Sequence, residues 1–185
     1  MFGFGEQSVG AYAVHLGANN MQIVFMGAMA PFIGSVSQMV SAEVVDKLQE
    51  RRKVYMLGAI IQDLSWLPMM LTIFLVAPAN INLVIFAFIL YMVAMHLTVP
   101  PWLSMMGDLV PESISGRYFG RRNAWAIFTQ LITTSIAAVF LEIAKAYNLF
   151  SQDTALSISI GFIILFGAAF ICLAISVYYV SRMYS

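Results

Sequence analysis

Three ionisable side chains of this sequence, Glu6, Asp63 and His96, stand inside runs of apolar residues. A carboxylate or an imidazole in such surroundings can take up and release a proton, or hold a polar solute. An ionised carboxylate at the centre of a bilayer costs on the order of 2.5–3.5 kcal/mol, so each group should face a bundle interior, a partner or water. These residues are therefore candidates for a substrate or proton path.

Each of these residues also has a structural interpretation. Glu6 is close to the N-terminus and could extend toward the membrane surface. Asp63 follows Gln62 and could be a structural acid that hydrogen-bonds to neighbouring helices, and His96 could be an interhelical hydrogen-bond partner. Other polar residues within apolar stretches could line the same path: Gln7, Tyr12, Tyr91 and Gln130.

The elements that must position these side chains are membrane-spanning helices. The chain is 61% hydrophobic, with nine basic and nine acidic residues among 185, too few charges to cover a water-soluble globule. Five apolar runs are each long enough, at 1.5 Å per residue, to cross about 30 Å of hydrocarbon. These runs cover residues 21–41, 54–77, 82–106, 123–146 and 156–180. A sixth run at 2–17 reaches only about 24 Å, so we interpret it as a truncated first helix.

The sequence thus predicts an all-α membrane protein with six transmembrane helices. Glu6, Asp63 and His96 then fall roughly 14–17 Å from a membrane boundary, near the midplane. The connections 42–53, 107–122 and 181–185 share one side with the N-terminus, and 18–20, 78–81 and 147–155 lie opposite. All basic residues except Lys145 belong to the first side: Lys47, Arg51, Arg52, Lys53, Arg117, Arg121, Arg122 and Arg182. The positive-inside rule makes that side cytoplasmic, with both termini in the cytoplasm.

Several classes of function find no support in the sequence. The formal net charge is zero, which argues against nucleic acid as a partner, and Cys172 has no second cysteine for a disulfide. No basic stretch and cleavage site mark a signal peptide. No P-loop, GxSxG or HExxH motif occurs, and two distant histidines do not form a metal-binding pattern. We therefore expect no enzymatic activity, no cofactor and no metal.

Charge gathers in two stretches, EVVDKLQERRK (43–53) and GDLVPESISGRYFGRRN (107–123). In both, acids come first and arginines follow, so acids of one helix end can pair with arginines nearby. Such pairs could act as a latch that closes one side of the bundle. The alternative is that the arginines only fix the topology and bind anionic lipid headgroups. The candidate latch residues in the second stretch are Asp108, Glu112, Arg117, Arg121 and Arg122.

Three segments resemble bacterial permeases of the major facilitator superfamily: LGANNMQIVFMGAMAPFIG, DKLQERRKVYMLGAIIQ and PPWLSMMGDLVPESISGRYFGRRNAW. The resemblance covers nearly the entire chain. It implies twelve helices in two six-helix halves, each built from two inverted three-helix repeats, with the substrate site between the halves. It also implies that helices 1 and 4 line the cavity, which favours Glu6 and His96 over Asp63. In the loop after helix 2, the resemblance implies that Asp46, Arg51 and Arg52 stabilise the outward-facing state.

We interpret residues 1–185 as the N-terminal six-helix half of a secondary active transporter, and the chain as incomplete. It would move a small solute by alternating access across the bacterial inner membrane, with protons as a coupling ion through Glu6 or His96. Its partners would be membrane lipids and a missing C-terminal half or a second six-helix unit. The alternatives are a non-transporting membrane scaffold that binds a partner or lipid, and a half-size transporter that dimerises. The fold does not select a substrate.

Overall fold

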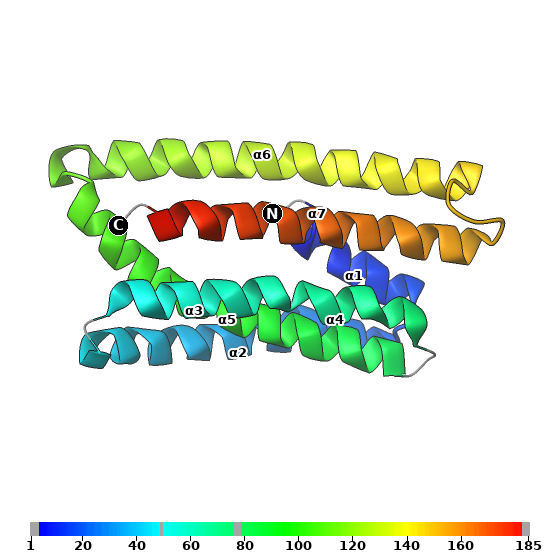
Figure 1. Cartoon of the computed structure of the whole chain (residues 1–185), viewed down its shortest axis with the longest axis horizontal. Helices are drawn as coiled ribbons and strands as arrows, with labels where there is room; N and C mark the ends of the chain where they lie inside the picture. The colour runs from blue at the N-terminus through cyan, green and yellow to red at the C-terminus, as the bar shows by residue number, and fades with distance from the viewer. Residues whose placement is uncertain (1–3, 49, 76–78, 183–185) are drawn as a thin grey trace.

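The protein is a bundle of helices. A computed structural model describes residues 4–48, 50–75 and 79–182, and this part of the chain contains helices and no strand. The elements are α1 (Glu6–His15), α2 (Asn20–Leu48), α3 (Arg51–Leu64), α4 (Trp66–Leu71), the 3₁₀ turn η1 (Thr72–Phe74), α5 (Ala79–Leu109), α6 (Glu112–Tyr147) and α7 (Thr154–Arg182). The long helices run roughly along one direction (Figure 1).

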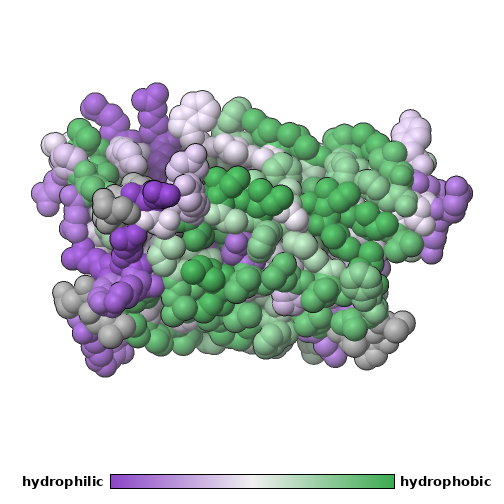
Figure 2. All heavy atoms as spheres, viewed as in Figure 1, coloured by the Kyte–Doolittle hydropathy of each residue, from purple (hydrophilic) through white to green (hydrophobic). Residues whose placement is uncertain are grey.

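Five segments of the described chain are long and apolar enough to cross a membrane. They are Asn20–Lys47, Arg51–Phe74, Asn80–Leu109, Glu112–Tyr147 and Thr154–Arg182, and the second of these combines α3, α4 and η1. Hydrophobic side chains form a broad band in the middle of the molecule, and hydrophilic ones gather at its two ends (Figure 2). These features are those of an integral membrane protein, as the sequence predicts.

The first apolar run forms only the ten-residue helix α1. α1 lies in one half of the bundle only, and the connection from α1 to α2 is at the end of that half (Figure 1). The helix begins near the middle of the bundle's long axis (Figure 1), and Glu6 is its first residue.

Basic residues concentrate at the opposite end of the bundle. Lys47 lies in the last turn of α2, Arg51 begins α3, and Arg182 lies in the last turn of α7. These helix ends meet at the left of Figure 1, where α6 also begins. Lys145, in the last turn of α6, lies at the other end.

The charged stretches are more helical than the sequence suggested. The expected connection at 107–122 shortens to Val110 and Pro111, because α5 continues to Leu109 and α6 begins at Glu112. Proline at the cap and an acid in the first turn both favour a helix start, a local signal that an apolar-run criterion does not register. The expected connection at 42–53 is likewise short, with α2 ending at Leu48 and α3 starting at Arg51.

Proline shapes two of the spanning segments. Pro68 cannot donate a hydrogen bond to the carbonyl of Leu64, and the helix is interrupted there, between α3 and α4. Pro101 lies inside α5 and leaves the carbonyl of Leu97 without its helical donor. The hydroxyl of Ser41, on α2, donates to that carbonyl oxygen at 2.6 Å. A side chain of α2 thus satisfies the backbone group that proline frees in hydrocarbon.

Large aromatic side chains fill the core where the helices converge. Tyr12, Trp66, Tyr91 and Phe166, from α1, α4, α5 and α7, are all 0% exposed. The Trp66 ring centroid lies 4.9 Å from that of Tyr91 and 5.5 Å from that of Phe166. Such ring contacts add to the burial free energy and hold four elements together. They place α1 and α5 next to each other.

Candidate functional site

The contact between Glu6 and Tyr91 is the centre of the candidate site. Tyr91 donates its phenolic hydrogen to Oε2 of Glu6, with 3.2 Å between the oxygens. Tyr91 is completely buried, while Glu6 remains partly exposed beside it. A carboxylate with one partner and remaining lone pairs can accept a further donor or a proton. Two of the residues proposed for the path are therefore in direct contact.

Packing fixes the Tyr91 ring in this position. Trp66 packs against one side of it, and the Phe88 ring stacks at 6.2 Å with an interplanar angle of 8°. Gly5 permits the close approach of α1, because a Cβ atom there would overlap Cη2 of Trp66. A larger residue at position 5 would move Glu6 away from Tyr91. The close packing of α1 against Trp66 thus explains why a glycine precedes Glu6.

Gln62 extends the polar site onto α3. It lies next to the Tyr91 hydroxyl, and its amide nitrogen Nε2 has no hydrogen-bond partner among the described residues. Two more buried polar atoms close to it in sequence also lack a partner in this part of the chain, Oδ1 of Asp63 and Nε1 of Trp66. Unsatisfied buried polar groups are costly and mark places where a solute or a proton could bind. Gln62 at the end of α3 and Trp66 at the start of α4 lie on either side of the helix interruption, which their positions in the sequence alone do not reveal.

His96 lies against α2 rather than against Glu6. Its Nδ1 is 2.9 Å from the carbonyl oxygen of Met92, and a Cβ atom on Gly34 would come within 2.5 Å of the same nitrogen. The imidazole is still within electrostatic range of the Glu6 carboxylate. Asp63 is 8% exposed and forms no hydrogen bond with Glu6 or Tyr91, so the structure joins Glu6 and Tyr91 but leaves Asp63 apart.

Tyr12 belongs to the core. Its hydroxyl is 2.6 Å from Oγ1 of Thr72, which also donates to the carbonyl oxygen of Met69. The Tyr12 hydroxyl therefore attaches α1 to the turn η1.

Gln7 and Gln130 lie close to each other, since both line a hollow of about 330 Å³ between α1 and α6.

At the basic end, the structure pairs two of the candidate latch residues. Nη1 of Arg51, at the start of α3, lies 2.5 Å from Oδ2 of Asp108, near the end of α5. Arg52 donates to the carbonyl oxygen of Ser181 at 2.6 Å, which attaches α3 to the end of α7. Both contacts are solvent-exposed and join helices within the described bundle.

The remaining candidate latch residues are exposed on the surface, and one of them contacts an aromatic ring. Asp46 is exposed on α2, and Glu112, Arg117 and Arg121 are exposed on the first turns of α6. Arg122 stacks on an aromatic ring, with its Cζ 4.1 Å from the ring centroid of Trp102. The sequence alone does not predict that contact, which joins residues of two different helices.

No family model, curated protein or solved structure matches this chain. The site must therefore be interpreted from its own geometry. Among the described residues, no three His, Cys, Asp or Glu side chains group as they would around a metal ion.

Proposed function

We propose that this chain is one six-helix half of a secondary active transporter of the major facilitator type. It moves a small solute across the bacterial cytoplasmic membrane by alternating access. The hydrogen bond between Glu6 and Tyr91 carries the proposal, because it joins an acid and a hydroxyl of two helices near mid-depth. An ionisable residue inside the membrane that faces another helix is a functional group by default.

The pattern of helix contacts supports the proposed repeat. The second and third spans, α2 and α3, both contact α5, which is the fourth span. The fifth and sixth spans, α6 and α7, both contact α1, the first span, and α3 contacts α7. In two inverted three-helix repeats, the second and third helices of each repeat would likewise contact the first helix of the other repeat.

The exposed faces of α2 and α6 support the proposed second unit. Large apolar side chains project from both helices, including Phe32 at 63% exposure and Leu131 at 64%. Such faces must be covered by lipid or by another helical unit. The same observation suits a half-size transporter that dimerises, which is the second candidate function. In either case the basic end would face the cytoplasm.

Uptake into proteoliposomes tests the proposal. The protein would be reconstituted together with the membrane proteins encoded by neighbouring genes, and uptake of a panel of radiolabelled small solutes would be measured. For a solute that accumulates, Glu6→Gln should lower uptake by about tenfold or more, as the loss of one charge-assisted contact would. Glu142→Gln is the matched control, since Glu142 is an exposed acid of α6. Equal uptake by the two variants, or no accumulated solute, would overturn the proposal.

Copy number separates the two candidates. Native mass spectrometry of the active protein should give one copy of this chain with a second six-helix unit for a divided transporter. Two copies and no other subunit would identify the half-size transporter.

Proton coupling has its own test: uptake that keeps its pH dependence in both Glu6→Gln and His96→Ala excludes these groups as the coupling site.

A further inference from the structure

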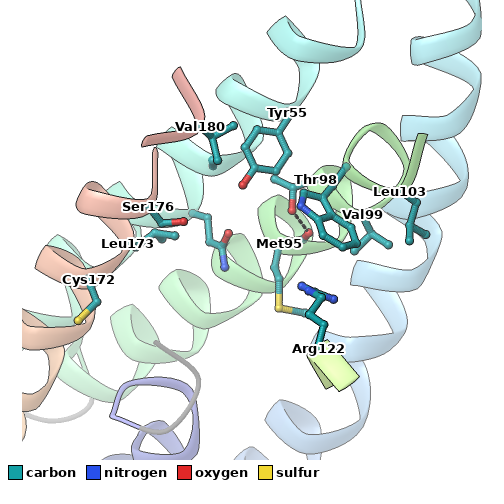
Figure 3. A pocket seen from close by; sticks show the side chains of 13 residues that line it. Tyr55, Met95, Thr98, Val99, Leu103, Arg122, Cys172, Leu173, Ser176 and Val180 are labelled. Carbon is teal, nitrogen blue, oxygen red and sulfur yellow. Dashed lines mark hydrogen bonds between the residues drawn. The ribbon is translucent and has the colours of Figure 1, made fainter. Parts of the chain in front are cut away.

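A second cavity lies nearer the basic end of the bundle and shares Gln62 with the site around Glu6 and Tyr91. It has a volume of about 540 Å³ and is lined by thirteen residues of α3, α5, α6 and α7. Figure 3 shows Tyr55, Ser176 and Arg122 directing their polar groups toward the same space from three helices. Four helices thus converge on one partly open volume, where Arg122 and Ser176 are exposed, and its size suits a small molecule.

The polar groups around this cavity are mostly hydrogen-bond donors. Arg122 supplies a guanidinium, and the Tyr55 hydroxyl is within its electrostatic range. The amide nitrogen of Gln62 lines the cavity, is 3% exposed as a residue, and has no partner among the described residues. The hydroxyl of Thr98 is already committed, since it donates to the carbonyl oxygen of Met95. None of the thirteen lining residues is Asp or Glu.

The guanidinium is oriented by an aromatic ring. Arg122 stacks over Trp102 at 4.1 Å, and one of its nitrogens donates to Oδ1 of Asn123 at 3.2 Å. The ion pairs within the described part of the chain do not include it. An arginine that stacks through its face keeps other N–H groups in its plane for a ligand. No carboxylate of the described residues therefore forms an ion pair with this positive charge.

The remainder of the lining is apolar. Val99, Leu103, Leu173 and Val180 surround the donors, so a ligand needs an apolar portion as well as a polar head. Arg122 is itself exposed, but the apolar side chains beside it lower the local dielectric, which strengthens hydrogen bonds from a cation and from neutral donors to an anion. A cationic ligand would meet Arg122 with no carboxylate in the lining to offset the repulsion.

We propose that this cavity binds an amphipathic anion, with its carboxylate or phosphate head at Arg122, Gln62 and Tyr55 and its apolar part between α5 and α7. The ligand is either a soluble organic anion or the headgroup and first methylenes of an anionic lipid. The proposal concerns a site within one six-helix unit and does not depend on the proposed transport function.

Binding of hexyl phosphate and of dihexanoyl phosphatidylglycerol to the purified protein tests the site and distinguishes the two sources. Affinity for the preferred probe should fall about tenfold in Arg122→Gln, the size of effect expected when a charged hydrogen bond is lost. Arg121→Gln is the matched control, because it removes the same charge from the neighbouring exposed residue, which does not line the cavity. Preference for hexyl phosphate identifies a soluble anion, and preference for the lipid identifies a headgroup.

A second measurement uses the unmodified protein. Cys172 lines the cavity and is the only cysteine of the sequence, so its alkylation by N-ethylmaleimide can be followed by peptide mass. Hexyl phosphate or the short-chain lipid should slow the alkylation, whereas neutral hexyl glucoside should not. The proposal is wrong if both arginine variants bind alike, or if the neutral and anionic compounds protect Cys172 equally.

Discussion

Tyr91 of α5 donates a hydrogen bond to Glu6 of α1, although the two residues are 85 positions apart in the chain. The contact exists because Trp66 packs against the Tyr91 ring and because Gly5 lets α1 come close to Trp66. A polar contact between an early and a central helix therefore rests on an aromatic core contributed by α4 and α5. This arrangement explains how a single acid is held inside the bundle.

Replacing Tyr91 with phenylalanine should separate this contact from its packing. The ring remains, so we expect the protein to fold and lose only about 0.5–1.5 kcal/mol of stability, typical of one interhelical hydrogen bond. Solute uptake should fall much more than stability, because Glu6 loses the one side-chain donor that it has among the described residues. Uptake and thermal unfolding would be measured together. Tyr178→Phe, on the exposed surface of α7, is the control, and equal losses in both variants would deny Tyr91 a special role.

Ser41→Ala should destabilise the bundle by about 1–2 kcal/mol. The hydroxyl of Ser41 is buried and donates to the Leu97 carbonyl that Pro101 leaves unpaired, and no water is available in hydrocarbon to replace it. Ser35→Ala is the matched control on the same helix, because Ser35 is exposed and bonds only within α2, to Pro31. Thermal unfolding in detergent should show a clear decrease for Ser41→Ala alone. A similar decrease in both would mean that the proline compensation is unimportant.

The membrane spans were predictable because they depend on composition and length. Five apolar runs in the sequence correspond to five helices that are long and apolar enough to cross a membrane. The helix ends were less predictable, since Glu112 and the arginines after it continue a helix without adding to hydropathy. Local signals such as Pro111 at the cap decide these ends.

The site was only partly predictable for a related reason. An acid such as Glu6 is conspicuous in an apolar run, but its partner is determined by packing between distant segments. Arg122 was expected in a charged latch, and it lies instead over the ring of Trp102. Charge alone does not distinguish an ion pair from a stacking contact, because both depend on which side chain the neighbouring helix presents.

Two glycines of the described helices should respond in opposite ways to alanine. At Gly58 of α3, a Cβ atom would lie 2.8 Å from Cγ2 of Thr98 and 3.2 Å from the backbone oxygen of Ala94. The backbone of α5 cannot move without separating the two helices, so Gly58→Ala should cost about 1–3 kcal/mol. At Gly107 nothing lies within 4 Å, and alanine should be neutral or stabilise the helix by up to about 1 kcal/mol. Opposite shifts in unfolding temperature are expected, and a stable Gly58→Ala protein would contradict the close crossing of α3 and α5.

The exposed pair of Arg51 and Asp108 should matter more for conformation than for stability. Both side chains are solvent-accessible, at 39% and 71%, so their ion pair should contribute at most about 1 kcal/mol. Asp108→Asn should therefore leave the unfolding temperature nearly unchanged.

If the pair acts as a latch, the variant should shift the population toward a state open at the basic end, because removing a contact made in one state favours the other. Labelling of a cysteine introduced at Val54, which is half-buried near the start of α3, in a Cys172→Ser background, would report that opening. The exchanged pair, Arg51→Asp with Asp108→Arg, should restore the original labelling rate, and Glu43→Gln, which breaks the pair with Lys47 inside α2, should leave it unchanged. A labelling rate that is the same in Asp108→Asn and in the unmodified pair would limit Arg51 and Asp108 to a role in topology.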